Sequence, residues 1–152
     1  MPRAPFQVLV FPFRPTANGN WEYAIFRRAD LGWWQGIAGG GEDDETPLDA
    51  ARRESSEEAG IPLASRFIAL DTTASIKVSW FRDFEQWGDR YVIPEHAFGI
   101  ECEPDTALTL SDEHDEVRWL PYDEAEPLLR FDSNRTALWE LDLRLRGLHP
   151  RD

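Results

Sequence analysis

Cysteine is almost absent from this 152-residue sequence, which contains Cys102 alone. A single cysteine cannot form an internal disulfide, and no cysteine or histidine accompanies it at the spacing of a zinc site, so we expect a reducing compartment. We interpret Cys102 as a small buried residue. Long apolar runs are also missing, because the run at residues 6–13 is too short to span a membrane, and we expect no signal peptide. These absences predict a cytoplasmic protein without a membrane partner.

Basic residues are scarce as well. The chain has 29 Asp and Glu residues against 16 Lys and Arg, and its formal net charge is −13. A nucleic-acid polymer would be repelled by such a surface, so we expect no partner of that class. A small phosphorylated ligand is compatible with this charge if metal ions neutralise the contact. No repeat, linker or low-complexity segment divides the chain, and we expect one domain over residues 1–152.

Apolar segments alternate with turn signals along the chain. Strands are expected at residues 6–13, 21–28, 67–70, 76–81, 96–103 and 117–120, and the turn at residues 16–20 predicts a hairpin between the first two. Helices are expected at residues 121–129 and from residue 133 onward, where Ala137, Leu138, Leu141 and Leu145 recur at helical spacing. This order predicts an α/β (α+β) fold with a mixed β-sheet between helices.

The most informative stretch runs from Gly39 to Ile61, where we expect a glycine-rich loop to lead into a short acidic helix. Thr46 is a suitable N-cap, Pro47 fits the first helical position, and Gly60 is suited to end the helix. The ends of this helix are therefore well defined by local sequence.

This helix has two different faces. One face carries residues expected to pack on the sheet, namely Leu48, Ala51, Ser55 and Ala59. The other carries three carboxylates at positions i, i+3 and i+4, namely Glu54, Glu57 and Glu58. Like charges at this spacing destabilise an isolated helix, which favours a compensating divalent cation such as Mg²⁺ or Mn²⁺. The alternative is a solvated acidic face that holds no ligand.

Eight residues of this stretch match the Nudix box, G-x5-E-x7-R-E-U-x-E-E-x-G-U, at every fixed polar and glycine position. They are Gly39, Glu45, Arg53, Glu54, Glu57, Glu58, Gly60 and Ile61. The sequence therefore resembles the Nudix hydrolases, and the resemblance implies an α/β/α sandwich. One position departs, because Ser55 stands where the family usually has a bulky aliphatic residue, on the face that we expect to pack.

The resemblance also implies roles for individual residues. Glu54, Glu57, Glu58 and the carbonyl group of Ala38 would ligate Mg²⁺, or Mn²⁺ in its place. Arg53 and Glu45 would pair and orient this assembly. Nudix subgroups take the general base either from the box, here Glu57, or from a carboxylate much later in the chain. For the distal ligand or base we choose Glu113 in the acidic segment 110–120, and the alternative is an exposed acidic loop.

Shorter similarities point to the Nudix subgroup of nucleoside and dihydroneopterin triphosphate pyrophosphohydrolases. They lie at residues 26–28, 34–35, 113–114, 119–120 and 133–135. We expect Arg27 and Arg28 to contact phosphates, with ordinary surface charge as the alternative. We expect the pair Asn134 and Arg135, at a helix start, to meet a phosphate tail or a ring edge, with helix capping as the alternative. Of Trp33 and Trp34, we expect one to form a wall for a base or pterin ring and the other to close the core.

The predicted reaction is hydrolysis of a (deoxy)nucleoside or dihydroneopterin triphosphate to the monophosphate and pyrophosphate. ADP-ribose and dinucleoside polyphosphates are the alternative substrates, although residues 76–79 lack the proline and the tyrosine that Nudix enzymes of those types tend to carry. A third alternative is a Nudix module that binds a nucleotide without cleaving it, but such a module would be expected to lose box carboxylates. Both a monomer and a homodimer are compatible with the sequence.

Overall fold

The computed structural model describes residues 2–152. Its strands are β1 (Arg3–Pro15), β2 (Trp21–Arg28), β3 (Trp34–Gln35), β4 (Ile37–Glu42), β5 (Phe67–Lys77), β6 (Val92–Glu101) and β7 (His114–Leu120). Its α-helices are α1 (Pro47–Ala59), α2 (Tyr122–Ala125) and α3 (Asp132–Leu145), and short 3-10 turns occur at Val78–Trp80, Phe84–Trp87 and Glu126–Leu128.

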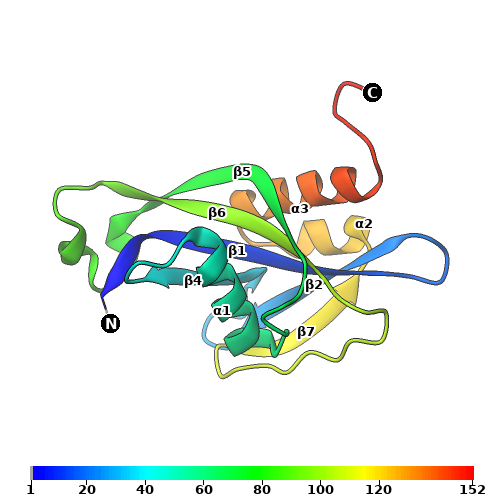
Figure 1. Ribbon diagram of the computed structural model, residues 1–152, viewed down its shortest axis with the longest axis horizontal. Helices are drawn as coiled ribbons and strands as arrows, with labels where there is room; N and C mark the ends of the chain where they lie inside the picture. Colours follow the sequence, from blue (N-terminus) through cyan, green and yellow to red (C-terminus); the bar gives the residue numbers. More distant parts are fainter. Residues whose placement is uncertain (1) are drawn as a thin grey trace.

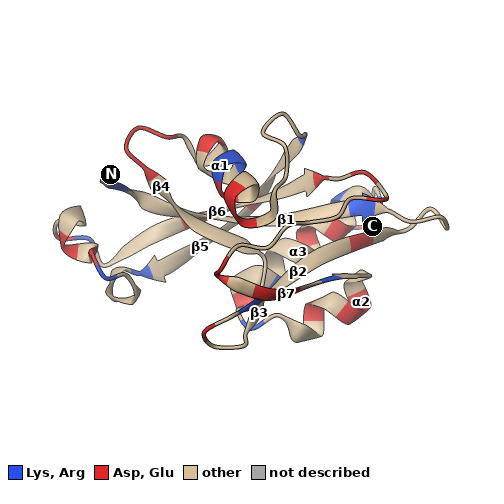
Figure 2. Cartoon of the chain, turned by 90° about the horizontal axis from the view of Figure 1, so that it is seen from below, with Lys and Arg blue, Asp and Glu red and all other residues tan. Residues whose placement is uncertain are grey.

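Strand β1 lies at the centre of the mixed sheet. Within residues 2–152 the sheet has seven strands, of which five follow the order β3-β2-β1-β6-β5, while β4 pairs with β1 and β7 pairs with β2. β1 is antiparallel to β2 and parallel to β6. Helix α1 covers one face of the sheet, and α2 and α3 cover the other (Figures 1 and 2). The predicted layering of a mixed sheet between helices is therefore confirmed.

Both faces of the central strands are buried, which explains their nearly continuous apolar sequences. Successive side chains of a strand point to opposite faces, so one apolar run can serve two layers. Under α1 lie Val8, Val10, Ala24 and Phe26. Against α2 and α3 lie Leu9, Phe11, Phe13, Tyr23 and Ile25. The predicted hairpin of β1 and β2 is also confirmed, with Phe13 opposite Tyr23.

The glycine-rich segment is not the loop that we expected. Gly39 and Gly40 pair with β1 as part of β4, and Gly41 continues the same strand. A Cβ atom built on these glycines would lie within 2.2 Å of a side-chain atom of Glu54, Arg3 or Phe6 respectively. The glycines are therefore required by close approach of neighbouring side chains rather than by a turn.

The expectation of two strands at residues 67–70 and 76–81 is also wrong. A single strand, β5, runs through both segments as far as Lys77, and its register with β6 shifts between Ala69 and Thr73. Residues 78–80 form a 3-10 turn instead. The polar link is extended because β6, which begins at Val92 rather than at residue 96, provides pairing partners on both sides of the shift.

Helix α1 begins and ends as predicted. The Thr46 side chain accepts a hydrogen bond from the Asp49 backbone N–H at 3.1 Å, and the Asp49 carboxylate accepts one from the Thr46 N–H at 3.1 Å. Gly60 ends the helix with φ 70°. Its buried side differs from our expectation, because Leu48 is exposed, whereas Glu54 and Glu58 are buried beside the small residues. Two box carboxylates thus lie on the inner side of the helix.

Cys102 is buried in the core cluster beneath α1, directly after β6, which agrees with our interpretation of it as a small core residue. Burial raises the pKa of its thiol to about 11, so the reactive thiolate is rare at neutral pH. No helix in residues 2–152 is both long enough and apolar enough to cross a membrane.

Candidate active site

A pocket of about 1420 Å³ opens between the sheet and the start of α3. Its wall includes residues from β1, β2, β3, β5 and β6 and from the loops beside them, namely Gln7, Arg28, Trp33, Gln35, Ile76, Trp80, Phe81, Glu95, Glu113, Arg130, Phe131, Ser133 and Asn134. A smaller hollow adjoins it and shares several of these residues, and there Glu54 and residues 38–42 complete the wall. The hollow that Gly39 and Glu54 of the box border is thus continuous with a large pocket.

Glu54 is the most deeply enclosed carboxylate of this hollow, with a side chain that is 11% exposed. It packs against Gly39 so closely that a Cβ atom there would lie 2.1 Å from its carboxyl carbon. Burial raises the pKa of Glu54 to about 7, and the neighbouring Arg53 guanidinium opposes the shift. An anion in this position gains more from a nearby cation than an exposed carboxylate does.

Arg53 connects the helix to the glycine strand. Its Nε and Nη2 atoms donate to the two oxygens of Glu45 at 2.9 and 3.0 Å. Nη2 also donates to the Gly40 carbonyl at 2.7 Å, and Nη1 donates to Glu54 Oε1 at 3.0 Å. These hydrogen bonds hold the pKa of Glu45 below its usual range. Arg53 and Glu45 therefore fix the position of α1, and with it the position of Glu54, relative to β4.

The other two box glutamates face different surroundings. Glu57 is 57% exposed at its side chain and contacts Arg53 at 3.3 Å. Glu58 is buried, accepts a hydrogen bond from the Ser111 hydroxyl and lies 3.6 Å from Nδ1 of His114. Within residues 2–152, no three Asp, Glu, His or Cys side chains converge closely enough to hold a metal ion. The three carboxylates are therefore not gathered into one patch.

The available donors nevertheless fit a hard divalent cation. Glu54, Ala38 and Glu113 border the same hollow, and they offer carboxylate and carbonyl oxygens, the ligands that such ions prefer. Glu113 is exposed at the rim, where partial burial and then the charge of Glu58 raise its pKa. Its backbone carbonyl accepts a hydrogen bond from the Ala29 N–H at 2.9 Å, which anchors the acidic segment beside β2.

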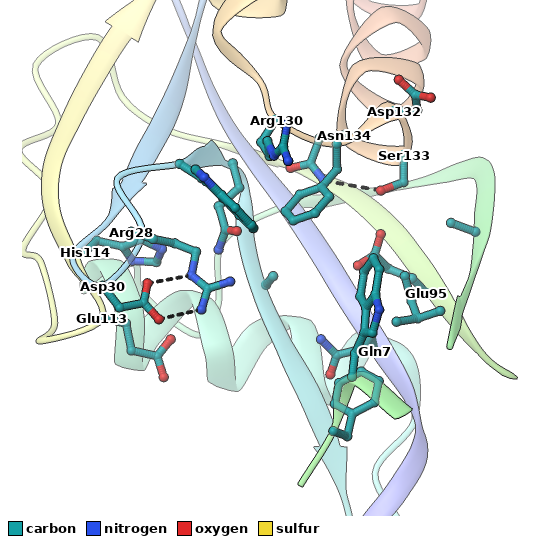
Figure 3. A pocket seen from close by; sticks show the side chains of 18 of the residues that line it. Gln7, Arg28, Asp30, Glu95, Glu113, His114, Arg130, Asp132, Ser133 and Asn134 are labelled. Atoms are coloured by element: carbon teal, nitrogen blue, oxygen red, sulfur yellow. Dashed lines mark hydrogen bonds and ion pairs between the residues drawn. The ribbon is translucent and has the colours of Figure 1, made fainter. Parts of the chain in front are cut away.

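The arginines that we singled out lie in different places. Arg28 lines both hollows and is bound by Asp30 at 3.0 and 2.7 Å (Figure 3). Arg27, the next residue along the strand, instead pairs with Asp115 at 2.8 and 2.9 Å. Arg135 pairs with Asp132 at 2.8 Å and borders neither hollow. Of these three arginines, the structure brings Arg28 alone to the pocket.

The two adjacent tryptophans also separate. Trp33 lines the pocket with its ring centre 5.8 Å from that of Phe131, whereas Trp34 packs against the core under α2 and α3. Trp80, which sequence reasoning missed, lines the pocket too, and its ring centre lies 6.2 Å from that of Phe131. Trp87 is buried and donates a hydrogen bond to the Arg3 carbonyl, away from the pocket.

Sequence reasoning pointed to Asn134 but missed three other polar residues of this pocket, namely Gln7, Glu95 and Arg130. Gln7 on β1, Glu95 on β6, Arg130 just before α3 and Asn134 in the first turn of α3 all line the pocket (Figure 3). The Asn134 Oδ1 atom accepts a hydrogen bond from the Gly36 N–H at 2.8 Å, which ties α3 to the segment between β3 and β4. A polar residue inside an otherwise apolar strand was the available signal for Gln7, whereas Glu95 fell outside the strand expected at residues 96–103.

Comparisons with known proteins identify the family and agree with the fold. A family model described as "NUDIX domain" matches residues 8–139. A protein of Listeria monocytogenes described as a NUDIX hydrolase is 42% identical to this chain and superposes on it with a TM-score of 0.85. The match covers 95% of this chain and 96% of the Listeria chain. The dihydroneopterin triphosphate diphosphatase of Haemophilus influenzae is 29% identical over 137 residues, which are 86% of this chain and 84% of that protein. The dihydroneopterin triphosphate pyrophosphohydrolase of E. coli shares the fold, with 22% identity and a TM-score of 0.76. That match covers 93% of this chain and 97% of the E. coli chain.

Proposed function

This chain belongs to the Nudix family and is a hydrolase of phosphoric anhydride bonds, and from that premise we propose its substrate class. The proposed reaction converts a (deoxy)nucleoside or dihydroneopterin triphosphate to the monophosphate and pyrophosphate, with Mg²⁺ as cofactor and Mn²⁺ as a possible substitute. One observation carries the proposal, namely that the hollow beside Glu54 is continuous with a larger pocket walled by aromatic rings. A ligand with phosphates at one end and a flat ring at the other matches that shape.

Nudix hydrolases generally use divalent metals such as Mg²⁺. When bound, such an ion would neutralise phosphate oxygens and acidify a water molecule. Glu54, Glu57, Glu58 and the Ala38 carbonyl would hold it. Glu57 and Glu58 would have to turn towards the hollow that Glu54 and Ala38 already border. The raised pKa of Glu54 supports this role, because a buried carboxylate without a full counter-charge favours cation binding.

The remaining residues have positional and proton-transfer roles in the proposal. Arg53 and Glu45 keep Glu54 in place through the hydrogen bonds described above. Glu113, at the rim beside Arg28, would accept the proton of the attacking water as the anhydride bond to phosphorus breaks and pyrophosphate leaves, with Glu57 as the alternative base. Arg28 would contact phosphate oxygens, since its guanidinium faces the junction of the two hollows.

The large pocket suits a planar heteroaromatic ring. Trp33, Phe131 and Trp80 contribute aromatic surface on one side, and the Arg130 guanidinium carbon lies 4.6 Å from the centre of the Trp33 ring. Aromatic side chains and guanidinium groups both stack on flat rings. The substrate ring would therefore lie in this pocket while its phosphates extend towards α1.

A substrate panel tests the proposal. Purified protein with Mg²⁺ would be incubated with nucleoside triphosphates, dihydroneopterin triphosphate, ADP-ribose and diadenosine polyphosphates, and products would be separated chromatographically. We expect one triphosphate to give its monophosphate and pyrophosphate, and we expect Glu54→Gln and Glu57→Gln to lower this turnover strongly. Glu124→Gln, an exposed carboxylate of α2, is the matched control. Cleavage of ADP-ribose with no turnover of any triphosphate would contradict the proposed substrate class.

A further inference from the structure

Glu95 is a buried carboxylate in the wall of the large pocket that the proposed chemistry does not use. It lies on β6 and is 7% exposed. Its Oε1 atom is buried and has no hydrogen-bond partner among residues 2–152. Burial raises the pKa of Glu95, the Ser133 hydroxyl opposes the shift, and no cationic side chain of residues 2–152 contributes to it. A buried acceptor without a partner is costly, so this oxygen is suited to a donor that arrives with a ligand.

Gln7 stands next to Glu95 on the neighbouring strand. The two residues are partners in the parallel pairing of β1 and β6, and both line the pocket. The Gln7 Oε1 atom already accepts a hydrogen bond from Arg3 Nη2 at 2.7 Å. The Gln7 amide nitrogen is therefore the end of that side chain with hydrogen-bonding capacity left for a ligand. Paired strands lie about 4.8 Å apart, so a carboxylate acceptor and an amide donor stand side by side.

This order of acceptor and donor matches one kind of ring edge. Guanine and pterin share a 2-amino-4-oxopyrimidine edge, which presents an amino group, a ring N–H and a carbonyl oxygen in sequence. A carboxylate can accept from the first two, and an amide N–H can donate to the third. Adenine and cytosine present a ring nitrogen acceptor in place of the ring N–H, and uracil and thymine lack the amino group.

We propose that Glu95, assisted by Gln7, selects substrates that carry a 2-amino-4-oxopyrimidine edge. The inference rests on the proposed function, because it assigns the ring to the large pocket. Trp33 and Phe131 provide aromatic surface in the wall of this pocket, and Glu95 lies on the side where Ser133 and Asn134 begin α3 (Figure 3). A site built around a buried acceptor rejects analogues that lack the matching donor more strongly than an apolar pocket does.

A purely structural role for Glu95 makes a different prediction. Glu95 lies near the start of α3, whose N-cap residue, Phe131, provides no side-chain hydrogen bond. A carboxylate in that position can stabilise the helix through its dipole and its free N–H groups. Replacing Glu95 would then lower stability and affect all substrates equally. Discrimination between substrates is therefore the quantity to measure.

The test compares GTP with inosine triphosphate, which differs only by the absent 2-amino group. For the wild-type enzyme we expect kcat/KM to be about 10- to 100-fold higher for GTP, the effect of one hydrogen bond to a charged group. Glu95→Gln should bring this ratio close to one by lowering the GTP value. Glu101→Gln, on the exposed end of the same strand, should keep the wild-type ratio. Equal treatment of the two nucleotides by the wild type, or an equal loss for both in Glu95→Gln, would overturn the inference.

Binding of the monophosphates separates this inference from the proposed function. Calorimetric titration with GMP and with IMP, without metal, needs no catalysis. Tighter binding of GMP by the wild type but not by Glu95→Gln supports the inference even if no triphosphate is hydrolysed. Hydrolysis of triphosphates with no such preference in either assay refutes the inference and leaves the proposed function intact.

Discussion

The close packing of Gly39 against Glu54 gives the most specific prediction for the metal site. In Gly39→Ala the new methyl carbon would lie 2.1 Å from the carboxyl carbon of Glu54, whereas ordinary van der Waals contact begins at 3.4 Å. The carboxylate must therefore retreat by more than 1 Å. A misplacement of about 1 Å can lower a catalytic rate about 100-fold, so we expect kcat to fall by about that factor. A higher Mg²⁺ concentration for half-maximal rate should accompany the loss.

Stability should change little in the same variant. The atoms that must move are the far end of a flexible side chain, and an added Cβ restricts the unfolded chain, so we expect the free energy of unfolding to stay within about 1 kcal/mol of wild type. Gly99→Ala is the matched control, because its methyl group would lie 2.6 Å from Leu141 Cδ1 in the core. It should lose about 1–3 kcal/mol of stability and keep kcat per folded molecule.

Steady-state kinetics over a Mg²⁺ titration, together with urea unfolding of the same preparations, measures both quantities. Gly39→Ala with a kcat within threefold of wild type and an unchanged Mg²⁺ dependence would refute the reasoning. In that case the carboxylate of Glu54 would not need its observed position for catalysis.

Three further predictions concern stability. Without metal, the free energy of unfolding should fall as pH rises from about 4.5 through about 7, because the folded state holds the Glu54 proton more tightly than the unfolded state; the full change is about 3 kcal/mol. Urea unfolding at several pH values should show this slope, and Mg²⁺ should reduce the slope above pH 7. The same slope in Glu54→Gln would show that the titration of Glu54 is not its cause. Tyr23→Phe removes the buried 2.7 Å hydrogen bond to Asp142 and should cost about 1–3 kcal/mol in urea unfolding, and no loss would show that Asp142 finds another partner. Thr46→Ala removes the N-cap of α1 and should cost about 1 kcal/mol by the same measurement, with an unchanged midpoint as the contrary result.

Local sequence predicted the features of the fold that depend on local chemistry. The ends of α1 followed from Thr46, Pro47 and Gly60, since capping involves residues that are close in the chain. The glycine strand was misread because glycine has two uses that the sequence does not distinguish. Gly39 avoids a clash with Glu54, fifteen residues further on, and that contact exists only in three dimensions.

The box spacing predicted which carboxylates belong together but not how they lie. Glu54 and Glu58 are buried on the inner side of α1 and Glu57 is exposed, because the helix is rotated further towards its acidic face than the apolar stripe suggested. Neighbouring residues such as Trp33 and Trp34 were expected to separate into wall and core. Which one faces the pocket depends on the pairing of Trp34 with β2, which sequence alone does not specify.

The polar wall of the pocket was the least predictable part. Glu95 lay just outside the strand expected at residues 96–103, so its position opposite Gln7 could not be inferred. Trp80 and Phe131 are distant in sequence and come together because the turn after β5 lies near the start of α3. Contacts of this kind depend on the whole sheet being assembled.

The most direct test of the proposed function is identification of the products by ³¹P NMR in the presence of Mg²⁺, with GTP and dihydroneopterin triphosphate as substrates and ADP-ribose as the comparison. The account predicts a monophosphate and pyrophosphate from a triphosphate, and loss of both signals in Glu54→Gln. Hydrolysis of ADP-ribose to AMP and ribose phosphate, with both triphosphates intact, would contradict it.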